Sequence, residues 1–113
     1  MRILFIENHS VFAKTVTQAF LADHQVKVVP SMQSALKELE SNDLYDLALI
    51  DYDLDDCKGD EITIKIKQLY PSIKIIATSS HSKGNNLIFR AGAHAICGKM
   101  DFKKIQSVID SIT

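Results

Sequence analysis

Five short apolar runs alternate with five amphipathic helical patterns, and this order constrains the fold more than any other feature of the sequence. The runs cover residues 3–6, 26–29, 47–50, 73–78 and 95–97. Four of them lack the polar and apolar alternation of a sheet with one wet face, so they predict strands covered on both faces, as in a parallel sheet. Residues 26–29 do alternate, which is typical of an edge strand.

Each run is followed by apolar residues at helical spacing. The five sets are Phe12, Val16, Ala19 and Phe20; Met32, Ala35, Leu36 and Leu39; Ile62, Ile66, Leu69 and Tyr70; Leu87, Ile88 and Ala91; and Phe102, Ile105, Val108, Ile109 and Ile112. Ser31 can serve as an N-cap, and Pro71 and Gly92 mark helix ends. Strict alternation predicts an α/β fold with right-handed crossovers and helices on both faces of the sheet. The 113 residues are too few for an eightfold barrel, so we expect one domain over residues 1–113, a doubly wound (βα)₅ three-layer sandwich.

The composition excludes several classes of protein. With 13 basic and 14 acidic residues the formal charge is −1, which gives no electrostatic reason to expect nucleic acid or a membrane surface as the main partner. No stretch approaches the roughly 18 apolar residues of a membrane span. Two cysteines do not make a disulfide framework, so we expect a cytoplasmic protein.

The densest negative charge directly follows the most apolar run. Residues 51–61, DYDLDDCKGDE, contain six carboxylates, and two carboxylates about 4 Å apart repel by roughly 4 kcal/mol at an effective dielectric constant of about 20. Asp51 ends the third strand at the carboxyl edge of the sheet, where doubly wound folds bind ligands. The first, fourth and fifth strands bring further polar residues to this edge: Glu7 and Asn8, Ser79, and Lys99. Oxygen ligands beside one ammonium group predict a hard divalent cation such as Mg²⁺ and a phosphate-like group.

These stretches resemble the response-regulator receiver domain, the CheY-like family of two-component signalling. The resemblance covers essentially the whole chain and rests on RILFIENH, DLALIDYDLDDCKGDE, YPSIKIIATSS and AGAHAICGK, at the ends of four strands. It implies the flavodoxin-like strand order 2-1-3-4-5 and a phosphoacceptor module rather than an enzyme. The partner it implies is a sensor histidine kinase or a phosphotransfer protein, with Mg²⁺ as the cofactor.

The resemblance also implies roles for single residues. Asp51 matches the phosphoacceptor, which becomes an acyl phosphate. Glu7 and Asn8 match the acidic pair that holds Mg²⁺, and Asp53 matches the position whose backbone carbonyl completes the metal shell. Lys99 matches the lysine that contacts the phosphoryl oxygens and compensates their charge.

The family's hydroxyl residue is expected near the end of the fourth strand. Counting forward from Gly59, which matches the family's loop glycine, and from Pro71 gives Ser79. Counting back from Gly92 gives Ala77 instead, unless the loop after this strand is short. Since Thr78, Ser79 and Ser80 are consecutive hydroxyl residues, we favour the short loop and predict Ser79, with Thr78 as the second choice.

Four positions depart from the family pattern. Asn8 replaces an acidic residue, and Ile96 replaces the aromatic residue that relays the signal. Asp55 stands where a proline often follows the acceptor strand, and Met100 stands where a proline often follows the lysine. An alternative is therefore a degenerate receiver, an interaction module that is independent of phosphorylation. A flavin or nucleotide binder on the same fold would need a glycine-rich or hydroxyl-rich loop after the first strand, and ENHSVF has no glycine.

Two expectations concern the surface. At 100° per residue, Phe89 points away from the apolar stripe of the fourth helix, toward solvent. The face formed by the fourth helix, fifth strand and fifth helix is a common docking surface in the family, so we expect Phe89 to contact a partner or a second copy of the chain in a homodimer. Asp55 and Asp56 are expected to be surface loop residues.

Overall fold

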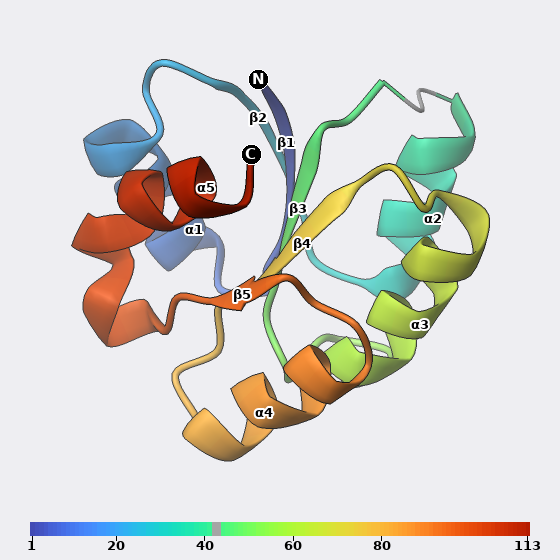
Figure 1. Ribbon diagram of the computed structural model, residues 1–113. Helices are drawn as coiled ribbons and strands as arrows, with labels where there is room; N and C mark the ends of the chain where they lie inside the picture. Colours follow the sequence, from blue (N-terminus) through green and yellow to red (C-terminus); the bar gives the residue numbers. More distant parts are fainter. Residues whose placement is uncertain (42–43) are drawn as a thin grey trace.

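The computed structural model describes residues 1–41 and 44–113 and contains the predicted sheet. Its five strands are β1 (Arg2–Ile6), β2 (Gln25–Val29), β3 (Leu47–Ile50), β4 (Lys74–Ala77) and β5 (Ala95–Ile96). All neighbouring strands pair in parallel, in the order β2-β1-β3-β4-β5 (Figure 1). The predicted fold class and strand order are therefore confirmed.

Within residues 1–41 and 44–113, five helices and one 3₁₀ segment connect and cover the strands. They are α1 (Ser10–Phe20), α2 (Met32–Ser41), α3 (Gly59–Leu69), α4 (Ser82–Arg90), η1 (Lys99–Lys104) and α5 (Ile105–Ile112). Figure 1 shows α1 and α5 on one side of the sheet and α2 and α3 on the other, with α4 beside β5. In the part of the chain that the structure describes, no helix is long and apolar enough to cross a membrane.

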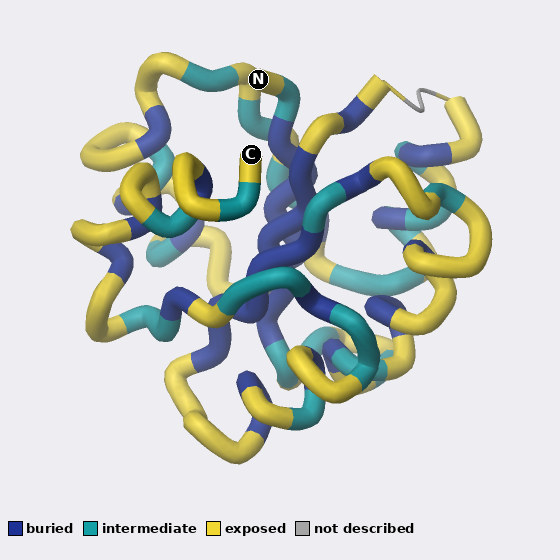
Figure 2. Tube along the Cα trace, in the orientation of Figure 1, coloured by how far each residue is buried: buried dark blue, intermediate teal, exposed yellow. Residues whose placement is uncertain are grey.

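The sheet is the most buried part of the molecule, because helices cover both of its faces (Figure 2). Successive strand residues point to opposite faces, and the core divides accordingly. Leu4 and Ile6 of β1 belong to the cluster under α2, α3 and α4, whereas Ile3 and Phe5 belong to the cluster under α1 and α5. Each such side chain contributes about 1.5–3 kcal/mol when fully buried. Because both faces are apolar, the polar groups of the strands are left at the strand ends.

The buried face of two helices ends earlier than predicted. In α1 the buried residues are Ala13 and Val16, and the predicted core residues Ala19 and Phe20 are exposed. Leu21, directly after the helix, is fully buried. It fills the place in the core that was predicted for the last turn of α1. In α3, Leu69 is 60% exposed, because it lies in the final turn, where the helix leaves the sheet before Pro71.

The fourth helix buries only part of the predicted face, since Ile88 is buried as predicted. Gly84, Asn85 and Ile88 are buried, while Leu87, which was predicted for the core, is partly exposed. Phe89 is 49% exposed, in agreement with the prediction that it points toward solvent. A buried asparagine on this helix was not expected, and it belongs to the site described next.

Candidate functional site

The carboxyl ends of the strands surround a small hollow of about 180 Å³. Its lining comes from four connections: Asn8 and His9; Asp51 and Asp53; Ser79, Ser80 and His81; and Lys99. Glu7 lies beneath this lining, with only 1% of its surface exposed. All the residues predicted for the site therefore lie at one edge of the sheet, since parallel strands bring their carboxyl ends together.

Lys99 contacts both buried carboxylates of the site. Its ammonium nitrogen lies 3.1 Å from Oε1 of Glu7 and 3.6 Å from Oδ2 of Asp51. The same nitrogen lies 4.9 Å from the centre of the Phe12 ring, a distance at which a cation is attracted to an aromatic face. Sequence reasoning assigned Phe12 to the core alone. Its contact with Lys99 could not be predicted, because it joins α1 to the start of η1.

The pKa of Glu7 is raised above its ordinary value. Burial of the carboxyl group is the main cause, and the nearby charge of Asp51 raises it further. The backbone N–H of His9, which donates to Oε2 over 3.1 Å, and the ammonium group of Lys99 oppose this shift. Two carboxylates therefore share one lysine in a poorly solvated place, and further positive charge would be stabilised there.

The donor set suits Mg²⁺ better than a transition metal. Among the described residues, no three His, Cys, Asp or Glu side chains are grouped as a metal site, but Mg²⁺ typically takes only one or two carboxylates and completes its shell with water and phosphate oxygens. Glu7 and Asp51 offer those carboxylates. Oε1 of Glu7 is buried and accepts no hydrogen bond from the described residues, so it is available to a cation in addition to its ion pair with Lys99.

Asn8 and Asp53 occupy the edge of this donor set. Asn8 is exposed, and its amide nitrogen donates a hydrogen bond of 3.3 Å to Oδ1 of Asp55. The carboxylate of Asp53 forms an ion pair with Lys58, which lowers the pKa of Asp53. The Asp53 side chain is therefore engaged away from Glu7, which leaves its backbone carbonyl as the group that it could offer to a metal.

The two candidate hydroxyl groups differ in access. Ser79 lines the hollow, and its Oγ accepts a hydrogen bond of 3.1 Å from the backbone N–H of His81, so its own proton remains free to be donated. Thr78 is fully buried and is not part of the lining, and its Oγ1 has no hydrogen-bond partner among the described residues.

Asn85 holds the backbone of Ser79 from α4. Its Oδ1 accepts from the Ser79 N–H over 2.7 Å, and its Nδ2 donates to the Ser79 carbonyl over 2.9 Å. Both polar atoms of a buried amide are thereby satisfied, and the start of α4 is tied to the end of β4. Sequence reasoning missed Asn85, because an asparagine beside another asparagine on a polar helix carries no signal of burial.

A sequence model of the response regulator receiver domain matches residues 3–110. The chain belongs to the response regulator receiver domain family. The resemblance that the sequence predicted is thus confirmed.

A sensor protein is among the curated relatives of this chain. The sensor protein TorS of Escherichia coli (strain K12) is 29% identical over 82 residues, which is 72% of this chain but 9% of TorS. This receiver domain therefore spans a small fraction of that curated relative.

Solved structures of similar fold include other receiver domains. A CheY-like response regulator receiver domain protein from Methanospirillum hungatei JF-1 has a TM-score of 0.80 at 24% identity, covering 97% of this chain and 94% of that chain. The response regulator protein TrrA from Thermotoga maritima, solved in complex with Mg(2+)-BeF, has a TM-score of 0.86 at 20% identity, covering 99% and 98%. At these identities the likeness is one of fold.

Proposed function

We propose that residues 1–113 form a single cytoplasmic receiver domain that accepts a phosphoryl group on Asp51. The donor is the phosphohistidine of a sensor histidine kinase or of a phosphotransfer protein. The observation that carries this proposal is the contact of Lys99 with both Glu7 and Asp51 below an open polar hollow. A lysine in this position can form an ion pair with the free Asp51 carboxylate and, after phosphorylation, with the phosphoryl oxygens.

In the proposed reaction a carboxylate oxygen of Asp51 attacks the phosphorus atom. The new oxygen–phosphorus bond makes an acyl phosphate, and the phosphorus–nitrogen bond of the phosphohistidine breaks, with its electron pair remaining on the imidazole. Lys99 and the Ser79 hydroxyl group bind the phosphoryl oxygens, so charge that develops during transfer meets groups already in place. Mg²⁺, when bound by Glu7, Asp51, Asn8 and the carbonyl of Asp53, supplies the remaining positive charge.

A degenerate receiver is the second candidate function, and the environment of Asn8 favours it. Asn8 brings no negative charge to the metal and is hydrogen-bonded to Asp55. Such a protein would keep the fold and its docking surfaces without a phosphorylation cycle. Ile96, 39% exposed in β5, also lacks the aromatic ring that the family uses to relay the signal.

Intact-mass spectrometry separates the two candidates. The protein is incubated with acetyl phosphate, with Mg²⁺ or with EDTA, and the Asp51→Asn variant serves as the matched control. A phosphoreceiver gains one acid-labile phosphoryl group in Mg²⁺, less in EDTA, and none in Asp51→Asn. If the wild-type chain gains no phosphoryl group even at high Mg²⁺, the result would favour the degenerate receiver.

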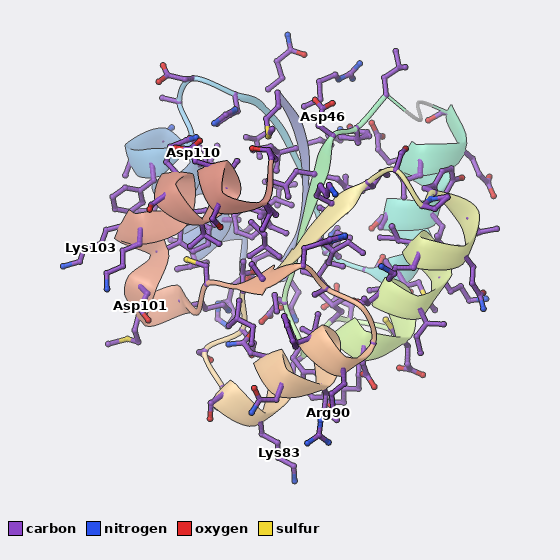
Figure 3. The ribbon with its side chains drawn as sticks, viewed as in Figure 1. Asp46, Lys83, Arg90, Asp101, Lys103 and Asp110 are labelled. Carbon is purple, nitrogen blue, oxygen red and sulfur yellow. The ribbon has the colours of Figure 1, made fainter. Side chains whose placement is uncertain are left out.

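The face formed by α4, β5 and α5 is the proposed contact with a partner or with a second copy. Phe89 is half exposed on α4. Figure 3 shows Lys83 and Arg90 projecting outward from α4, and Asp101 projecting outward from η1. A twofold interface must be complementary to itself, so in a homodimer Lys83 or Arg90 of one copy would meet a carboxylate such as Asp101 of the other.

A further inference from the structure

The loop between β3 and α3 is a compact unit with its own internal bonds. Asp53 and Lys58 form an antiparallel bridge, and the Leu54 N–H donates to the Cys57 carbonyl over 3.1 Å. The Gly59 N–H donates to the Tyr52 carbonyl over 2.7 Å. A Cβ atom at position 59 would overlap the carbonyl oxygen of Asp51, so glycine is needed for this close approach. These bonds fix the shape of the loop, and Leu54 and Cys57 pack its inner side against the core.

Asp56, at the tip of the loop, joins this unit to a different helix. Its Oδ1 accepts a hydrogen bond of 2.7 Å from the Met32 N–H, and its Oδ2 accepts one of 3.0 Å from the Gln33 N–H. The two backbone groups lower the pKa of Asp56, although burial acts in the opposite direction. Asp56 is exposed, as the sequence predicted, but it is not a free loop residue.

The first turn of α2 depends on this contact. A helix begins with four N–H groups that have no partner inside the helix. The N–H groups of Ser31 and Ser34 donate to the Oγ atoms of Ser34 and Ser31, respectively, as the predicted N-cap requires. The Ala35 N–H makes the first bond within the helix, to the Ser31 carbonyl. Those of Met32 and Gln33 are satisfied by Asp56, more than 20 residues away in sequence.

The same cap fixes the loop that carries Asp53. Figure 1 shows α2 starting at the end of the sheet where β3 runs into this loop. The Asp55 N–H also points toward the Pro30 carbonyl, at 3.5 Å. The two hydrogen bonds that Asp56 accepts are charge-assisted, so they are stronger than bonds between neutral groups.

We propose that Asp56 is a positioning residue for the metal site, which it serves by anchoring the β3–α3 loop to the first turn of α2. The anchor holds the backbone carbonyl of Asp53 toward the hollow that contains Asp51. It also makes the start of α2 sensitive to Mg²⁺, since coupling between two sites is reciprocal. This inference rests on the proposed function, because Mg²⁺ binding is its main consequence.

Two measurements on the full chain test the anchor. The first is Mg²⁺ affinity, by calorimetric titration with MgCl₂. The second is hydrogen exchange at the amides of Met32 and Gln33, and at Leu54 and Lys58 within the loop, without metal. Asp56→Ala should weaken Mg²⁺ binding about tenfold, as loss of a supporting contact around a metal site does, and should speed exchange at all four amides. Asp56→Asn keeps one acceptor oxygen, so its Mg²⁺ affinity and its exchange rates should lie between those of wild type and those of Asp56→Ala.

Two control variants separate anchoring from general effects. Asp23→Ala removes the same charge from an exposed turn between α1 and β2 and should leave both measurements unchanged. Ser31→Ala removes the other cap of α2 without touching the loop, so it should speed exchange in α2 and spare Mg²⁺ affinity.

The outcomes against the inference are distinct from those against the proposed function. Wild-type Mg²⁺ affinity in Asp56→Ala, with faster exchange only at Met32 and Gln33, would make Asp56 a helix cap and nothing more. Equal losses of affinity in Ser31→Ala and Asp56→Ala would also overturn the inference. A wild-type chain that binds no Mg²⁺ would contradict the proposed function instead, and exchange at Leu54 and Lys58 would still decide whether Asp56 holds the loop.

Discussion

Replacing Lys99 by methionine should destabilise the metal-free protein strongly at neutral pH. Methionine keeps most of the length and apolar surface of the lysine but removes the charge shared by Glu7 and Asp51. At an effective dielectric constant of about 20, unit charges at these separations attract by roughly 5 kcal/mol per pair. Much of this is offset by the desolvation of Lys99 itself. Removing one partner of a buried ion pair typically costs 3–5 kcal/mol, and because the lysine is partly exposed (17%) we expect about 3 kcal/mol.

The loss should depend on pH in a defined direction. The pKa of Glu7 is already raised by burial and by Asp51, and Lys99 opposes that shift, so Lys99→Met should raise it further. A carboxyl group with a raised pKa in the folded state contributes stability at low pH and loses it as the pH rises through the folded pKa. The difference between Lys99→Met and wild type should therefore be largest near pH 7 and shrink toward pH 5.

Urea unfolding in EDTA at several pH values measures this effect. Lys103→Met, in the same η1 segment but exposed, is the matched control and should change the free energy of unfolding by less than about 0.5 kcal/mol. A Lys99→Met protein as stable as wild type at pH 7 would refute the reasoning, as would a loss of stability that is the same at pH 5 and pH 7.

Three further predictions follow from the site and the surface. Asn8→Asp should tighten Mg²⁺ binding in a calorimetric titration and destabilise the metal-free fold, because it adds a third carboxylate; unchanged affinity would mean that position 8 does not face the ion. Phe89→Ala should weaken self-association or partner binding in analytical ultracentrifugation with little change in melting temperature, whereas lower stability with unchanged association would make Phe89 a core residue. His94 accepts a hydrogen bond at Nδ1 from the Ile75 N–H over 3.0 Å, and burial lowers its pKa. Neutral His94 should therefore stabilise the fold above its ordinary pKa, and this stability should be lost as the pH falls through the pKa of His94 in the folded protein. The free energy of unfolding in urea should depend less on pH over this range in His94→Asn, and an unchanged pH profile would contradict the prediction.

The fold could be predicted from the sequence because each element carries a local signal. Continuous apolar runs such as residues 47–50 indicate strands covered on both faces, and their alternation with helical patterns leaves few topologies. The errors lie in the last turns of α1 and α3, where local periodicity is weakest, and in α4, where Gly84 and Asn85 are buried and Leu87 is partly exposed. Ala19 and Phe20 continue the periodicity of α1, but Leu21 closes the core in their place, and only tertiary packing decides between the two.

The site was predictable to the extent that it depends on strand ends. Asp51 and Lys99 were expected at one edge because parallel strands place their carboxyl ends together, and the structure brings them to 3.6 Å. The contacts that support the site were not predictable. Asn85 and Asp56 act through hydrogen bonds to the backbone of other elements, and such bonds depend on the relative placement of elements rather than on any pattern in the sequence.

Locating the phosphoryl group tests the central claim most directly. The protein is phosphorylated with acetyl phosphate and Mg²⁺ and reduced with borohydride, which converts an aspartyl phosphate into homoserine, and its peptides are sequenced by mass spectrometry. We expect homoserine at position 51 alone, less of it when Mg²⁺ is replaced by EDTA, and none when Asp51→Asn is used. Homoserine at another aspartate of residues 51–61, or at none of them, would contradict the account.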